Sequence, residues 1–594
     1  MKTYLFIILI FAGHNLKSQN IDVIKNLISS ERFDDAYDSL IKFKNQYPQN
    51  PFVYFELGET VLKSYINDPY SETKKKAISD AENFFNQGTK QDSLNPINYV
   101  GLGIIELFRN EDTIKADTYF NKSISLIPEK KKKINDLHVN TLLKLSTSEL
   151  YAKSPRFYKA ESYINRLIKL KPKLPEVYIA FGDILLAKSD ASGAILNYKK
   201  ALYLRNTPLT NVLIARIYMM ARNLNESRVY FEDAIKMDSL FAPAYKGLGD
   251  LYYLAGQPRF AKENYIKFLQ LTGNNIPAKI NYLKALYKSK DYTEASNIAE
   301  EITKIDSSKI YLYRIAAYSG YDKENPQPEK ALYYIKELFK KAPQDEIIPR
   351  DYSYYGRILL KLNRDSSEKQ QGIQMFEKAY LTDTSDNFDL NELINAAYYN
   401  KDFKTAIRYE SVKIGKGEHS TDNYKLLGKA YYYNKDFAHA DSIFTIVVAK
   451  DTTNLDANIW LAYSLSSEDQ DMKMGLAKPC YERILRIIDD DKVKYSKEMF
   501  EAYSYLGSYY VFSKNVNYER AIDYFKQITE LDKDNTQWCL KGYYSLAYIY
   551  TKLKQWSKAK DSYEMVLKYK PGDTAAEKGI KDMNYNLVME ELNK

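Results

Sequence analysis

One arrangement of apolar, small and aromatic residues recurs along most of the chain at intervals of about 34 residues. The string YYNKDF occurs at 398–403 and returns 34 residues later, at 432–437. Around the second copy, five constrained positions follow one another, namely Leu427-Gly428, Tyr431, Ala440, Phe444 and Val447. The same residue types stand at the same offsets in 248–268. Apolar positions three and four apart, within a period of this length, predict two helices joined by a turn.

The small residue of the predicted second helix identifies fifteen successive repeats. It stands at Ala36, Ala81, Ala116, Ala160, Ala194, Ser227, Ala261, Ala295, Ala331, Gly372, Ala406, Ala440, Ala477, Ala521 and Ala559. Steps of 33 to 38 residues dominate, and four longer steps predict lengthened helices or loops near 60–80, 130–155, 361–371 and 486–500. We therefore expect a repeat array over residues 20–571. The first helix of the fourth repeat is expected near 142–151, where the pattern is weakest.

The five constrained positions resemble the tetratricopeptide repeat (TPR), whose helix-turn-helix unit carries these residue types at these offsets. The resemblance implies an all-α fold, an α-solenoid of about fifteen units that forms a right-handed superhelix. Gly249 and Ala261 are expected to be small because the two helices of a repeat cross there. Tyr265 is expected to fill the space between one repeat and the next. Residues 572–594 continue the helical periodicity and predict a capping helix over the last repeat.

The first nineteen residues have the pattern of a secretory signal peptide. A basic start at Met1-Lys2 precedes nine apolar residues at 4–12 and a polar segment at 13–19. Because a membrane-spanning helix takes about 20 apolar residues, we expect a leader, with an uncleaved loose anchor as the alternative. No later stretch is long and apolar enough to predict a transmembrane segment in the mature chain. The expected location is the bacterial periplasm, with peripheral association to the outer membrane as a variant.

Few residues of the chain suit catalysis or metal binding. There are four histidines and two cysteines, Cys480 and Cys539, and we find no glycine-rich phosphate loop or GxSxG turn. Cys480 and Cys539 belong to repeats that are not neighbours, so two free, buried thiols are expected. We therefore expect no catalytic residues, no metal and no cofactor. A hydrolase would need a site within the irregular segment 130–155.

The positive charge is concentrated in one quarter of the chain. Residues 151–300 contain 23 Lys and Arg against 13 Asp and Glu, a net charge of +10, whereas the whole chain carries +9. This segment could bind an acidic partner, a lipid headgroup or an anionic glycan. A solvated helix face rich in lysine is the interpretation that we favour. Nucleic acid is not an expected partner of an exported protein.

Tyrosine is the unusual residue, with 56 tyrosines against 25 phenylalanines. The TPR resemblance implies that first helices line a concave groove, with the residues one, four and five after the small position facing inward. The resulting groove positions are Arg216, Met219, Asp250, Tyr253, Lys284, Tyr287, Asn395, Tyr398, Tyr399, Lys429, Tyr432 and Tyr433. Tyrosine rings beside amides and lysines suit an extended peptide, and they suit a glycan equally well. Simple core packing is the third interpretation.

Lys425 joins these positions through a second family pattern. The family's terminal-carboxylate clamp uses Lys and Asn on successive repeats, and this chain has Lys425 and Lys429 after Asn391 and Asn395, which is a different combination. Such a clamp is therefore not expected.

The resulting hypothesis is a non-enzymatic periplasmic scaffold that binds a segment of an outer-membrane or secreted protein, within a secretion, outer-membrane assembly or gliding machine. The alternative is a carbohydrate- or peptidoglycan-binding envelope module.

Overall fold

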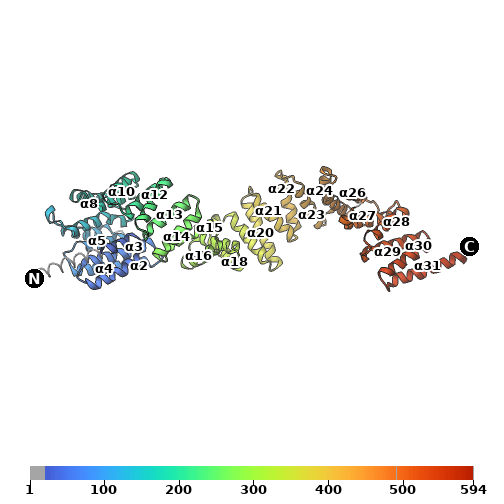
Figure 1. Cartoon of the computed structure of the whole chain (residues 1–594), viewed down its shortest axis with the longest axis horizontal. Coiled ribbons are helices and arrows are strands. Elements are labelled where there is room, and N and C mark those ends of the chain that lie inside the picture. The colour runs from blue at the N-terminus through green and yellow to red at the C-terminus, as the bar shows by residue number, and fades with distance from the viewer. Residues whose placement is uncertain (1–20, 111, 490, 593–594) are drawn as a thin grey trace. The chain divides into compact units, whose positions relative to one another are not determined.

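The computed structural model describes residues 21–110, 112–489 and 491–592, and all regular structure in these ranges is helical (Figure 1). The helices follow one another as antiparallel pairs, so the expected all-α repeat solenoid is confirmed. The chain divides into two compact parts, an N-terminal body up to Gln344 and a C-terminal body from Asp345.

Nine helix pairs form the N-terminal body. They are 21–29 with α2 (Phe33–Gln46), α3 (Pro51–Asn67) with α4 (Lys74–Gln91), α5 (Ile97–Asn110) with α6 (Thr113–Ser125), α7 (Asp136–Ser148) with α8 (Phe157–Leu170), α9 (Pro175–Ala187) with α10 (Ala191–Leu204), α11 (Pro208–Met220) with α12 (Leu224–Met237), α13 (Ala242–Leu254) with α14 (Pro258–Thr272), α15 (Ile276–Lys288) with α16 (Tyr292–Ile305), and α17 (Ile310–Asp322) with α18 (Pro328–Lys341). Three short 3-10 turns also occur, at η1 (Lys131–Lys133), η2 (Glu149–Tyr151) and η3 (Gln344–Glu346).

The C-terminal body contains six pairs and a last helix. They are α19 (Pro349–Leu362) with α20 (Ser366–Thr382), α21 (Asn387–Tyr399) with α22 (Phe403–Gly415), α23 (Thr421–Tyr433) with α24 (Phe437–Lys450), α25 (Leu455–Glu468) with α26 (Lys478–Ile488), α27 (Lys492–Phe512) with α28 (Tyr518–Leu531), α29 (Thr536–Lys552) with α30 (Trp556–Tyr569), and α31 (Thr574–Leu592). In α31, Ala576, Gly579 and Met583 are buried against the last repeat, whereas Tyr585 and Leu592 are exposed.

An aromatic ring on the second helix is held between glycines of successive first helices. Phe85 of α4 is fully buried, and a Cβ atom would lie 2.5 Å from its ring at Gly58 of the same repeat. At Gly101 of the next repeat, a Cβ atom would lie 2.3 Å from the same ring. Gly249 and Tyr265 make the equivalent contact, at 2.6 Å. The ring therefore fills the space between one repeat and the next, as expected, and it also requires a glycine in its own repeat.

The turn within a repeat explains the duplicated string YYNKDF. Lys401 and Lys435, the lysines of the two copies, both have φ 64°. The left-handed backbone at each lysine forms the tight turn between the two helices of the repeat. The aspartate that follows it caps the second helix. The side chain of Asp402 accepts a hydrogen bond from the backbone N–H of Thr405 at 3.2 Å. Asn-Lys-Asp is therefore a turn and a helix start, rather than a binding motif.

The structure corrects the expected first helix of the fourth repeat. Helix α7 begins at Asp136, not near 142, and it ends at Ser148 before a 3-10 turn. Asn135 starts the helix, because its side chain accepts a hydrogen bond from the N–H of His138 at 3.1 Å. The His138 ring accepts one in return from the N–H of Asn135 at 3.2 Å. The sequence did not indicate this reciprocal cap, because the third helical residue is His138 instead of the usual Glu or Gln.

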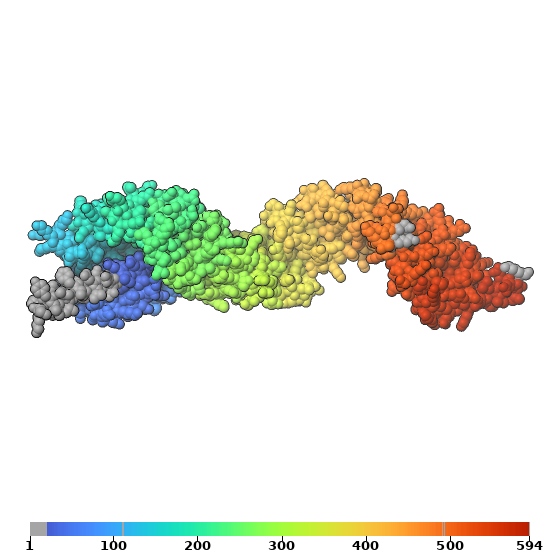
Figure 2. Space-filling view, in the orientation of Figure 1, coloured from blue at the N-terminus to red at the C-terminus, as the bar shows by residue number. Residues whose placement is uncertain are grey.

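The lengthened loop after α3 connects the first repeats of the N-terminal body to its eighth repeat. Asp68, buried in this loop, accepts a hydrogen bond from the backbone N–H of Ile276 at 2.9 Å. The side chain of Asn275 donates to that of Asn67 at 2.6 Å. Because Ile276 is the first residue of α15, Asp68 satisfies an N–H group that has no partner within the helix. The blue and green segments of this body lie against each other in Figure 2.

Replacing Gly428 by leucine tests the contact between glycine and ring. A Cβ atom at Gly428 would lie 2.7 Å from the Phe444 ring, so the larger side chain should lower the free energy of unfolding by about 1–3 kcal/mol. The three tryptophans, Trp460, Trp538 and Trp556, all lie in the C-terminal body, so tryptophan fluorescence during urea unfolding measures this body alone. Gly415→Leu is the control, because nothing lies within 4 Å of a Cβ atom there. Equal midpoints for the two variants would contradict the packing described.

Glu410 makes the stability of the C-terminal body depend on pH. Its side chain is 1% exposed, and neither carboxyl oxygen has a hydrogen-bond partner in the described part of the chain. Burial raises the pKa of Glu410 to about 7, despite the opposing charge of Lys413. Because the folded state favours the neutral acid, this contribution to stability is complete below the unfolded pKa and is lost as the pH rises through 7.

We expect the free energy of unfolding to fall by about 3 kcal/mol between pH 4.5 and pH 8, beyond the change seen in Glu410→Gln. Urea unfolding followed by tryptophan fluorescence measures the difference. Glu564→Gln, which replaces an exposed carboxylate on α30, should keep the parent's pH dependence. Identical pH profiles of the parent and Glu410→Gln would show that Glu410 is ionised in the folded protein.

Candidate functional site

The predicted site residues lie on first helices, in two separate groups. Arg216, Asp250, Tyr253, Lys284 and Tyr287 lie on α11, α13 and α15 of the N-terminal body. Asn395, Tyr398, Tyr399, Lys425, Lys429, Tyr432 and Tyr433 lie on α21 and α23 of the C-terminal body.

A cavity of about 450 Å³ lies beside α11, α13 and α15. It is lined by Asp250, Tyr253 and Lys284. Met219, which stands at the offset of Tyr253 one repeat earlier, also lines it. These residues meet because equivalent offsets on stacked helices point in the same direction. The volume is within the range of about 300–1,000 Å³ that is usual for ligand pockets.

The rim of the cavity is formed where the first helices end. Met220 and Leu254, the last residues of α11 and α13, line the cavity and are 64% and 40% exposed. Arg222 lines it from the turn after α11, where its backbone has φ 60°. None of these three residues was among the predicted positions. Met220 and Leu254 stand five positions after the small Ala215 and Gly249, so the offset of five should have included them, whereas Arg222 stands seven positions after Ala215 and lies beyond the rule.

Asp250 is held against the cavity wall by hydrogen bonds. The Tyr265 hydroxyl donates to its Oδ1 at 2.6 Å, and the Asn281 amide donates to the same oxygen at 3.4 Å. Burial raises the pKa of Asp250, while the bond from Tyr265 and the charge of Lys246 act in the opposite direction. Repeat five contains the same pair, in which Tyr198 donates to Asp183 at 2.6 Å. The recurrence indicates that this carboxylate mainly fixes the second helix to the first.

Arg216 and Tyr287 are directed to other parts of the body. Arg216 forms an ion pair at 3.6 Å with Glu31, which lies in the turn before α2, and Lys246 approaches the same carboxylate at 3.9 Å. The ring of Tyr287 packs on that of Tyr292 with centroids 5.8 Å apart. Of the predicted residues in this body, the structure places Asp250, Tyr253 and Lys284 together in the cavity lining. Arg216 and Tyr287 lie outside it.

The aromatic residues of the C-terminal group form one continuous cluster. Tyr432 and Tyr433 lie with their ring centroids 5.3 and 5.7 Å from the Trp460 ring. Tyr398 lies 6.4 Å from Tyr433. Tyr399 is 80% exposed, and Tyr433 is 47% exposed. Some tyrosines of the cluster are therefore mainly packed, and others expose much of their ring to solvent. Core packing and ligand binding must be weighed for each tyrosine separately.

Two members of this aromatic cluster were missed. Trp460 and Tyr463 lie on α25 with ring centroids 5.6 Å apart. Tyr463 stands one residue after the small Ala462, so the same offset rule would have found it. Trp460 precedes the small residue, and no offset of the repeat indicated it.

The lysines of the C-terminal group are paired within the chain. Lys425 and Lys429 approach Asp456 at 3.6 and 3.3 Å. Lys429 also lies 5.1 Å from the centre of the Trp460 ring. Asn395 is exposed on α21. Asp456 thus occupies the position that a ligand carboxylate would take between the two lysines.

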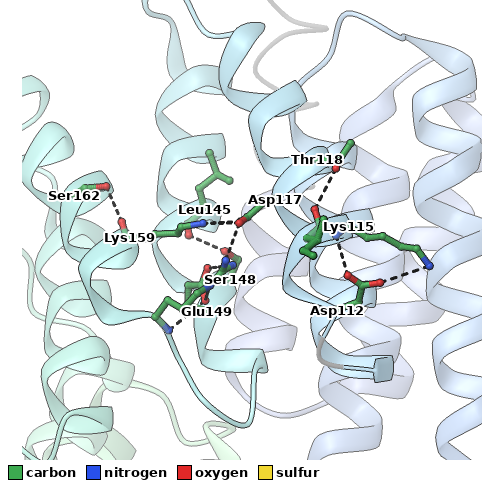
Figure 3. Close-up of polar contacts among 11 residues, drawn as sticks. Asp112, Lys115, Asp117, Thr118, Leu145, Ser148, Glu149, Lys159 and Ser162 are labelled. Carbon is green, nitrogen blue, oxygen red and sulfur yellow. Dashed lines mark hydrogen bonds and ion pairs between the residues drawn. The ribbon is translucent and has the colours of Figure 1, made fainter.

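The irregular segment before α8 contains a network of ion pairs, shown in Figure 3. The buried Glu149 accepts from Arg156 at 2.6 Å, and Arg156 also donates to Asp117 at 2.8 Å. Lys159 donates to Asp117 at 2.7 Å (Figure 3). These bonds lower the pKa of Asp117, although burial acts against them. The network joins α6 to α8 across η2. Its acidic and basic side chains pair with one another.

Cys480 and Cys539 are both buried and free, as expected. Within residues 21–110, 112–489 and 491–592, no group of three His, Cys, Asp or Glu side chains could hold a metal ion. No helix in these ranges is both long and apolar enough to cross a bilayer. The predicted signal peptide at 1–19 lies outside the described residues.

Comparison with known proteins supports the repeat type. The TPR family description matches residues 540–573, which belong to α29, α30 and the turn after them. The solved C-terminal part of a TPR repeat-containing protein from Cytophaga hutchinsonii is 25% identical, with a TM-score of 0.30, over 50% of this chain and 98% of its own. YrrB, described as a TPR protein with an unusual peptide-binding site, is 21% identical, with a TM-score of 0.28, over 30% of this chain and 93% of its own.

A TPR protein from Parabacteroides merdae is 16% identical, with a TM-score of 0.28, over 43% of this chain and 98% of its own. At these TM-scores the similarities add no argument about function. No curated protein matches the chain in sequence. The matched segment and the pairing of the helices support the tetratricopeptide repeat as the building unit of this chain.

Proposed function

We propose that this protein is a non-enzymatic scaffold that holds a segment of another protein against its first helices. The cavity of about 450 Å³ in the N-terminal body carries this proposal, because it combines an apolar wall with charged residues on a concave surface. Proteins built from tetratricopeptide repeats are generally interaction scaffolds rather than enzymes.

The proposed place of action is the bacterial periplasm, and the proposed partner is an outer-membrane or secreted protein of a secretion, assembly or gliding machine. This part rests on the sequence of residues 1–19, which has the basic, apolar and polar segments of a leader. It is independent of the cavity, so the two parts of the proposal can fail separately.

Carbohydrate or peptidoglycan binding is the alternative function, and the aromatic cluster of the C-terminal body favours it. Sugars stack on exposed aromatic rings, and Tyr399 is 80% exposed at the edge of this cluster. Tyr432 is a poorer probe than Tyr399, because its ring packs on Trp460 and on Phe437 at 5.3 and 5.4 Å. Its replacement would therefore disturb packing as well as binding.

Affinity capture from the native cell envelope after mild crosslinking tests the scaffold. The parent should retain a defined protein, and Tyr253→Ala should lose most of it, because a tyrosine of this kind supplies about 2 kcal/mol or more at an interface. Tyr203→Ala, which removes an exposed ring from the second helix α10, is the control. Capture of cell-wall fragments that depends on Tyr399, with no protein that depends on Tyr253, would favour the carbohydrate alternative.

A further inference from the structure

Two cations at the cavity of the N-terminal body are left without an acidic partner. Arg222 and Lys284 line the cavity, and neither forms an ion pair with a described residue. Two cations on α11 and α15, in contrast, are paired with acids of the chain. Arg216 lies 3.6 Å from Glu31, and Lys279 lies 2.7 Å from Glu301. The Lys284 ammonium lies 5.5 Å from the centre of the Tyr311 ring, a cation–π contact that supplies no negative charge.

The acid of the cavity does not compensate for these cations. Asp250 already accepts hydrogen bonds from Tyr265 and Asn281 through one oxygen. Asp250 is the one acid in the lining, against the two cations Arg222 and Lys284. The cavity therefore carries a net positive charge at its rim, and the surrounding segment 151–300 has a net charge of +10.

Three residues of the remaining lining are apolar and adaptable. Met219, Met220 and Leu254 line the cavity together with Tyr253. Methionine side chains are flexible and polarizable, so they fit apolar groups of different shapes. Met220 is 64% exposed, which leaves much of its side chain available to a partner.

We propose that this cavity binds an acidic segment of the partner protein, with a large apolar side chain against the methionines and flanking carboxylates on Arg222 and Lys284. The inference rests on the scaffold function proposed above and specifies its partner. Complementary charge carries the argument, because two free cations next to an apolar wall match an apolar residue flanked by acids. A neutral apolar segment would leave both cations without a partner.

Binding of synthetic peptides to the full-length protein tests this proposal by fluorescence anisotropy. The probe is a labelled peptide with one phenylalanine between Asp and Glu residues, acetylated and amidated so that no terminal charge remains. It should bind, and its affinity should fall as the salt concentration rises. The matched peptides replace the acids by Asn and Gln, or the phenylalanine by alanine, and both should bind about ten-fold more weakly or worse.

Variants of the cavity locate the interaction. Arg222→Gln and Lys284→Gln should each weaken the acidic peptide by about ten-fold, and Lys284→Arg should restore most of the affinity because it keeps the charge. Lys279→Gln is the matched control, since it removes the same charge from the same helix outside the lining. An equal loss in Lys279→Gln would show non-specific attraction and overturn the proposal.

Two further outcomes would also overturn it. Equal binding of the neutral peptide would remove the role of the cations, and binding only of a peptide with a free carboxyl terminus would assign the cavity to chain ends. Either result leaves the scaffold function intact if capture of the cellular partner still depends on Tyr253. Loss of that dependence would refute the scaffold function itself.

Discussion

The contact between a glycine of the first helix and an aromatic ring of the second is the constraint on which the rest of this structure depends. In the second and third repeats the Phe85 ring lies against Gly58 and Gly101, so one side chain fixes two successive first helices. Because each repeat contacts its neighbours in this way, residues at equivalent offsets point in the same direction along the array. Asp250, Tyr253 and Lys284 therefore reach one cavity from two successive repeats.

The two bodies use the same repeat to make different surfaces. In the N-terminal body, the loop after α3 binds the start of α15 through Asp68, which fixes the first repeats against the eighth. The cavity lies beside α11, α13 and α15 of the same body, and two of its cations have no acidic partner among the described residues. In the C-terminal body, aromatic rings cover the equivalent positions, and Asp456 pairs with the lysines beside them.

The repeat type, the fifteen small positions and four cavity residues could be predicted because they follow from local period and offset. The sequence could not place Arg216, whose partner Glu31 comes from the first repeat, because contacts between distant repeats leave no periodic signal. It also missed Trp460, which precedes the small residue of its helix and enters the cluster through its size. The start of α7 was misplaced because the Asn135 and His138 cap departs from the usual residue types.

The central claim is that the cavity of the N-terminal body holds another protein. Its most direct test places a photo-crosslinking amino acid at Tyr253, inside the cavity, and in a second strain at Tyr287, which packs on Tyr292 outside the lining. After illumination of living cells, mass spectrometry should identify one protein joined to position 253 and absent from position 287. Equal products from both positions, or crosslinks only to glycan, would contradict the account.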